Sequence, residues 1–204
     1  MSSQVSPILY FRSIFQPKDT FAELSSSYPS PAKVLFQYTI LLLLLPPVFS
    51  WIGGYSFGWR LGAAEPLMFS VKTLTLISLG YFLALVFGFV STAVISRWMA
   101  ATYDAKTSLG LHFAFITVVG EPLALASAAH LFPDVFFNVI VMIPTMIWSM
   151  YLLYTGIPVV LDIPPERGML MASALVGWLL VAAVSLLGIT MGLWTAGIGP
   201  VLGV

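Results

Sequence analysis

The chain has 204 residues, of which 59% are hydrophobic and only 8% are charged, whereas a soluble domain carries about 25% charged residues. This composition excludes an ordinary soluble domain and predicts a protein in contact with the lipid bilayer. The formal net charge of zero argues against a nucleic-acid partner, which requires clustered Lys and Arg. Because cysteine is absent, disulfides, thiolate chemistry and Cys-ligated metals are excluded as well.

Residues 1–31 form the only substantial polar segment, which we expect to be cytoplasmic. Within it, residues 16–24 are predicted to form a short helix, because Pro17 suits a first turn and Asp19 lies early. Apolar side chains recur at spacings of three and four along the segment: Phe11, Ile14, Phe15, Phe21 and Leu24. This pattern predicts an amphipathic, interfacial helix on the bilayer surface, with a poorly ordered tail as the alternative.

Five apolar stretches follow, each long enough for the roughly 20 residues that a bilayer core requires. They cover residues 32–52, 68–98, 108–132, 134–157 and 169–197. The predicted fold is therefore an all-α polytopic membrane protein. It consists of a five-transmembrane-helix bundle over residues 32–204 and the short N-terminal helix before it.

The basic residues predict the orientation of these spans. With the N-terminus in the cytoplasm, six of them lie inside: Arg12, Lys18, Lys33, Arg97, Lys106 and Arg167. The other two, Arg60 and Lys72, lie outside. This bias agrees with the positive-inside rule and places the C-terminus outside.

Small residues form rows on two of the spans. On the second span they recur every four residues, at Gly80, Ala84, Gly88, Thr92 and Ser96. On the last span, Gly188 and Gly192 have the same spacing. Such rows let helices approach closely, so we expect packing there, either within the chain or between copies in a homo-oligomer.

Glu121 is the only acid near the middle of a span, where it costs roughly 2.5–3.5 kcal/mol on insertion scales. We therefore expect it to face protein, on the same side of the helix as Thr117. No Lys or Arg lies in the central part of any span, so the carboxyl group is expected to be protonated and to donate a hydrogen bond. Pro122, which lacks an N–H, follows it. Two interpretations stay open: a substrate or proton site, and a buried carboxyl that stabilises packing at a kink.

The sequence gives little support to metal or enzymatic chemistry. His112 and His130 lie 18 residues apart, about 27 Å along one helix, and each is out of phase with Glu121. The nucleophile motif G-x-S-x-G and the zinc motif H-E-x-x-H are both absent. We therefore expect no cofactor, no metal and no enzymatic activity.

Residues 151–168 separate the last two apolar stretches and carry Asp162, Glu166 and Arg167. Their prolines are expected to stop both flanking helices. The candidate hinge residues are Tyr154, Gly156, Pro158, Asp162, Pro164, Pro165, Glu166 and Arg167.

This region resembles the Yip family of Ypt/Rab-interacting membrane proteins, in its bacterial branch. The resemblance rests on YLLYTGIPVV at 151–160 and PPERG at 164–168. Further support comes from the segment Phe11–Phe15 with QPKDTF at 16–21, from Glu121-Pro122 and from the five expected spans. The D-L-Y-G-P signature of the eukaryotic members is absent, which makes Rab-GTPase binding doubtful.

The resemblance implies membrane organisation or trafficking in a bacterial inner membrane, without catalysis. The leading hypothesis is a scaffold that binds an unknown membrane protein partner. The alternative is a small transporter or channel that uses Glu121.

Overall fold

The computed structural model describes residues 12–197. After a helical turn at residues 12–15, the elements are α2 (Pro17–Ser25), α3 (Pro31–Val34), the π-helix η1 (Leu35–Thr39), α4 (Ile40–Phe57), α5 (Val71–Ala100), α6 (Leu109–Ala126), the 3-10 helix η2 (Ser127–Leu131), α7 (Val135–Leu161) and α8 (Pro165–Thr195). The described residues include no strand, only two isolated bridges that involve the loop between α4 and α5. The all-α prediction is confirmed.

The five predicted spans are confirmed as five helices long and apolar enough to cross a membrane. Their bounds differ most from the prediction at three places. The first span continues beyond residue 52 to Phe57, the fourth continues beyond residue 157 to Leu161, and the last begins at Pro165. The first span also contains Pro46 and Pro47. A proline removes one backbone hydrogen bond, which neighbouring helices make tolerable in a transmembrane helix. The helix α4 ends at Phe57, and Gly58 follows it with a positive φ of 68°.

Local side chains explain several helix ends. Ser70 caps α5, where its hydroxyl accepts a hydrogen bond from the Thr73 N–H. Asp134 caps α7 in the same way, accepting from the Phe137 N–H at 2.9 Å. The helix α7 ends at Leu161 and is followed by Asp162, which adopts the left-handed conformation (φ 61°) that Asp tolerates better than most residues. In α8, Pro165 occupies the first turn, where its missing N–H costs nothing.

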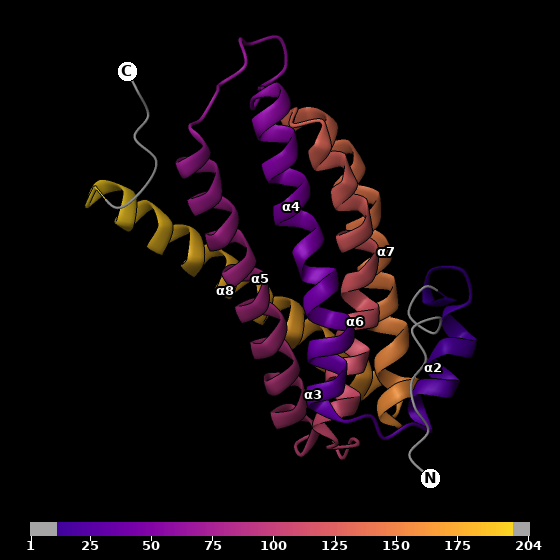
Figure 1. Ribbon diagram of the computed structural model, residues 1–204. Coiled ribbons are helices and arrows are strands. Elements are labelled where there is room, and N and C mark those ends of the chain that lie inside the picture. Colours follow the sequence, from indigo (N-terminus) through magenta and orange to yellow (C-terminus); the bar gives the residue numbers. More distant parts are fainter. Residues whose placement is uncertain (1–11, 198–204) are drawn as a thin grey trace.

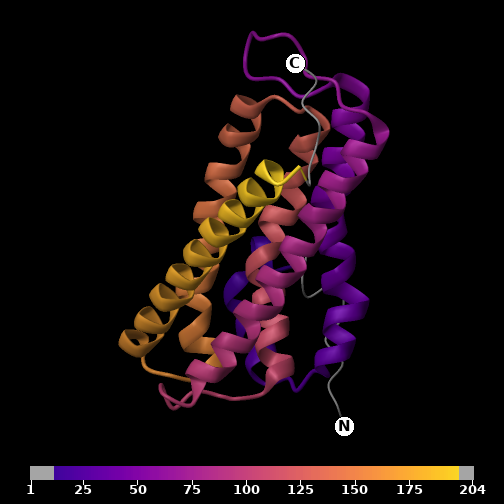
Figure 2. The same ribbon diagram turned by 90° about the vertical axis from the view of Figure 1, so that its left-hand side faces the viewer.

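The helix α6 forms the centre of the bundle. Two thirds of its span (67%) is buried inside the protein, against 11–22% of the other four. The helices α4, α5 and α7 pack around it, and α8 contacts α5 and α7. In both overall views α8 crosses the other helices obliquely (Figures 1 and 2), and in Figure 1 its C-terminal half leaves the bundle. The core therefore lies around the first half of α6, where Leu111, Phe115 and Ile157 are buried.

The two ends of the bundle carry different segments. One end holds α2, α3 and the connections at residues 101–108 and 162–164, and the other holds the loop between α4 and α5 (Figure 1). The segments bearing the six predicted inner basic residues thus lie toward one end, and those bearing Arg60 and Lys72 lie at the opposite end. This grouping agrees with the one that the charge count predicts.

Candidate functional site

Glu121 lies in α6 and is 1% exposed. Its Oε2 accepts a hydrogen bond of 3.0 Å from the hydroxyl of Ser13, which is fully buried. The two residues are 108 positions apart in the chain. Glu121 therefore faces protein, as predicted, but the contact in the structure has its carboxyl group as the acceptor. Sequence reasoning missed Ser13 because a serine in a polar N-terminal segment carries no signal that sets it apart.

Thr117 continues this buried polar row one helical turn before Glu121. Its Oγ1 donates to the carbonyl of Phe113 and lies 2.8 Å from the Oγ1 of Thr39. Thr39 is the last residue of the π-helix η1, and its hydroxyl also reaches the carbonyl of Val34. A π-turn has one extra residue per turn and often marks a functional position. Here it brings a hydroxyl against α6. Pro122 is buried and does not end α6, which continues to Ala126.

The helix α2 lies against α6 and α7, not on a free surface. Phe21 and Leu24 are 2% and 0% exposed, and the Phe21 ring meets Phe115 edge to face at 6.1 Å. Gly156 of α7 makes room for both rings, because a Cβ there would collide with Phe115 and lie 2.9 Å from Phe21. The predicted N-terminal helix is present. Protein covers only Phe21 and Leu24 of the apolar residues expected to face lipid, whereas Phe15 is 85% exposed and Phe11 lies outside the described residues.

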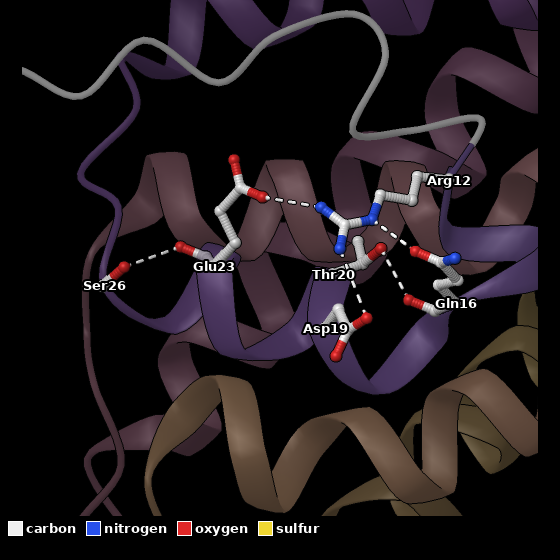
Figure 3. A network of polar contacts seen from close by, with 6 residues as sticks. All are labelled: Arg12, Gln16, Asp19, Thr20, Glu23 and Ser26. Atoms are coloured by element: carbon white, nitrogen blue, oxygen red, sulfur yellow. Dashed lines mark hydrogen bonds and ion pairs between the residues drawn. The ribbon is translucent and has the colours of Figure 1, made fainter.

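The opposite face of α2 carries a compact charged network (Figure 3). The Arg12 guanidinium donates to Gln16 at 2.8 Å and to Asp19 at 3.3 Å, and lies 3.6 Å from Glu23. These side chains are exposed, so each pair adds little stability. Together these contacts pair the Arg12 guanidinium with side chains of its own N-terminal segment. Ser13, the next residue, points to Glu121 from the buried side.

Lys106 joins three segments at the same end of the bundle. Its N–H donates to the carbonyl of Leu161, its Nζ to that of Ser25, and its own carbonyl lies 2.9 Å from the Nε2 of His112. The other ring nitrogen of His112 lies 2.8 Å from the hydroxyl of Ser96. Both nitrogens of His112 therefore have protein partners. Among the described residues, no group of three His, Asp or Glu side chains could hold a metal ion.

A comparison with known protein families identifies the family of this chain. The model of the Yip1 domain matches residues 11–196, nearly the whole chain. The chain belongs to the Yip1 domain family. The resemblance seen in the sequence is thus confirmed.

Two similar proteins place the chain among bacterial members of this family. The inner membrane protein YohC of Escherichia coli strain K12, and that of strain O6:H1 (CFT073), are each 28% identical to it over 161 residues. The matched region covers 79% of this chain and 83% of each relative. No solved structure matches the chain significantly. It is therefore a Yip1-domain membrane protein with relatives in the bacterial inner membrane.

The predicted hinge of this Yip1 domain is shorter than expected. The helix α7 continues through Pro158 to Leu161, and only residues 162–164 separate it from α8. Gly168 of α8 leaves room for the Pro158 ring, and the carbonyl of Pro158 accepts from the N–H of Ile163 at the end of α7. The expectation that these prolines stop both helices at residues 157 and 169 is therefore wrong.

The other hinge candidates contact α8 or lie in it. Tyr154 reaches across to α8, where its hydroxyl lies 3.0 Å from that of Ser173. Arg167, in the first turn of α8, pairs with Asp104 of the preceding connection at 2.7 Å. Glu166 supplies an acid to the same turn, and Pro164 occupies the N-cap position. The region thus ties α7 and α8 together at the end that also carries Lys106.

The small-residue rows divide into a packed part and an open part. On α5, Thr92 and Ser96 are buried, and Ala84 is half-buried. A Cβ added at Gly80 or Gly88 would meet nothing within 4 Å, and the same holds for Gly188 and Gly192 on α8. These four glycines therefore make no close contact within the described chain. The expected packing at these glycines is not found within the described chain.

Close backbone approaches occur at glycines that the sequence rows did not include. At Gly53 a Cβ would collide with the carbonyl of His130, and at Gly110 with the carbonyl of Pro29. Gly53 belongs to no repeat of small residues, whereas Gly110 is followed four residues later by Ala114. Only the folded structure shows which backbones these glycines meet.

Proposed function

We propose that this Yip1-domain protein is a non-enzymatic scaffold that binds other components of the inner membrane through α5 and α8. The observation that carries this proposal is the open space beside Gly80, Gly88, Gly188 and Gly192. Small residues in a transmembrane helix favour close contact with another helix. Within the described chain these positions have no neighbour, so a partner helix or a second copy has room to approach.

The surroundings of Glu121 support a scaffold over a transporter or channel. A transport site needs a polar path from the acid to at least one face of the membrane. Glu121 is 1% exposed, and the hydroxyl groups near it on α6 and η1 belong to Thr117 and Thr39, which are 2% and 0% exposed. Each has a partner inside the protein. In this proposal Glu121 has a structural role and anchors the N-terminal segment through Ser13.

In the proposed topology the N-terminus and residues 162–164 lie in the cytoplasm, and the C-terminus lies outside. The grouping of α2, the 101–108 connection and the start of α8 at one end supports it, because that end carries most of the basic residues. Rab-GTPase binding is not part of this proposal, since the sequence lacks the signature of the eukaryotic members.

Two leucine variants on α8 test the scaffold proposal. Gly188→Leu places a large side chain on the open row, and Thr190→Leu places the same side chain about 200° away on the helix. Both positions are exposed. We expect Gly188→Leu to lose the membrane proteins, or the differently tagged second copy, that co-purify with the wild type from native membranes, and Thr190→Leu to keep them. Equal retention by the two variants would contradict the proposal.

A further inference from the structure

A cavity of about 210 Å³ lies at the end of the bundle opposite α2. It is formed by α4, the loop between α4 and α5, and the start of α7, and its walls are mostly apolar. Val135 and Val139 line it and are 38% and 47% exposed. Because α7 spans the membrane, these two side chains face lipid, so the cavity opens toward the hydrocarbon. Its volume exceeds the roughly 150 Å³ of an engineered cavity known to hold benzene.

Asp134 lines this cavity, and the backbone of Arg60 lies beside Asp134 without an ion pair between the two side chains. The backbone of Arg60 is joined to the chain before α7: its N–H donates to the carbonyl of Pro133, and its carbonyl accepts from the N–H of Val135. Arg60 is thereby bridged to Asp134, which lines the cavity. The described chain has only three ion pairs, and neither Arg60 nor Asp134 takes part in any of them. Among the described residues, the exposed guanidinium of Arg60 also makes no side-chain hydrogen bond.

The position of the two charges matches the depth of lipid headgroups. Arg60 lies shortly after the span that ends at Phe57, and Asp134 lies directly before the span that begins at Val135. Trp59, whose ring type favours the membrane interface, lines the cavity beside them. An occupant must therefore combine a hydrocarbon chain with a headgroup that satisfies one cation and one anion.

We propose that this cavity binds a zwitterionic phospholipid with a primary amine, of the phosphatidylethanolamine class. One acyl chain fills the apolar cavity along Val135, Val139 and Met142. The phosphate accepts hydrogen bonds from the Arg60 guanidinium, whose fork geometry suits phosphate oxygens. The ammonium group donates to the carboxylate of Asp134, of which Oδ1 also caps α7. A quaternary ammonium headgroup has no N–H for this contact, and a glycerol headgroup has no cation.

The test uses the purified full-length chain with equal amounts of phosphatidylethanolamine, phosphatidylcholine and phosphatidylglycerol, and native mass spectrometry to count bound lipids. We expect the wild type to retain phosphatidylethanolamine most strongly. Arg60→Gln should lower lipid retention roughly fivefold, the effect of one surface cation. Asp134→Asn, which can still cap α7, should remove the preference for phosphatidylethanolamine over phosphatidylglycerol. The control Lys72→Gln removes the other basic residue of the outer set and should change nothing.

Val139→Trp fills the cavity and should reduce the retention of all three lipids. If that variant fails to fold, Arg60→Gln still decides, because the Arg60 side chain is exposed. Lipid retention that is the same in the wild type and in Arg60→Gln would overturn the proposal. So would a headgroup preference that survives Asp134→Asn, or a second copy of the chain found in the cavity in place of lipid.

Discussion

Removal of the hydrogen bond between Ser13 and Glu121 should destabilise the protein, and a double-mutant cycle measures by how much. Each of Ser13→Ala and Glu121→Ala leaves one buried polar group without its partner, since the two side chains are 0% and 1% exposed. An unsatisfied buried group costs about 1–3 kcal/mol. Glu121→Gln keeps an oxygen that can accept from Ser13, so its loss of stability should be the smallest of the three.

The coupling energy between the two positions is the quantity that tests this reasoning. Hydrogen bonds in membrane proteins contribute about 0.6 kcal/mol on average and up to about 2 kcal/mol. We therefore expect the double variant Ser13→Ala/Glu121→Ala to be more stable than the sum of the single losses implies, by that amount. The assay is reversible unfolding in mixed detergent micelles, followed by circular dichroism. Losses that add to within about 0.3 kcal/mol, the usual result for independent sites, would refute the contact.

Three further predictions follow from the packing and the topology. Gly156→Ala should lower the melting temperature in detergent, because its Cβ collides with Phe115 and overpacking costs about 1–3 kcal/mol. Gly120→Ala, where a Cβ meets nothing within 4 Å, is the matched control and should not lower it. Gly88→Leu should leave the melting temperature of the monomer unchanged, since the surroundings of Gly88 are open. It should reduce the amount of partner proteins or second copies that co-purify. A lowered melting temperature would show instead that Gly88 packs within the chain. In intact cells, a single cysteine at Glu65 should react with a membrane-impermeant thiol reagent, and one at Glu166 should not. The reverse result would show that the topology is the opposite of the proposed one.

The sequence predicts the parts of this fold that depend on hydrophobic length. An apolar run of about 20 residues must span the bilayer whatever its neighbours are, so five spans follow from composition. Helix ends are less certain, because a proline removes only one hydrogen bond and the tertiary structure decides whether the helix continues. Pro158 shows this, since the small residue Gly168 makes room for its ring.

The candidate site depends on contacts that no local pattern encodes. The cost of an acid at mid-depth predicts that Glu121 is buried, but nothing near it in the sequence points to Ser13, 108 residues away. The apolar spacing of Phe21 and Leu24 indicates an amphipathic helix, and it fits a lipid surface as well as a protein surface. Only the folded structure, in which Gly156 makes room for Phe21, shows that α2 packs against α6 and α7.

The access of water to position 121 tests most directly the claim that the N-terminal segment seals Glu121 inside the bundle. The chain has no native cysteine, so the variant Glu121→Cys carries a single thiol, and Glu65→Cys in the exposed loop provides the reference rate. A small, membrane-permeant reagent that reacts only with thiolates modifies cysteines in contact with water. We predict that Glu65→Cys reacts fully while Glu121→Cys stays unmodified in native membranes. Modification of Glu121→Cys at a rate near that of Glu65→Cys would reveal a water-filled path and contradict the account.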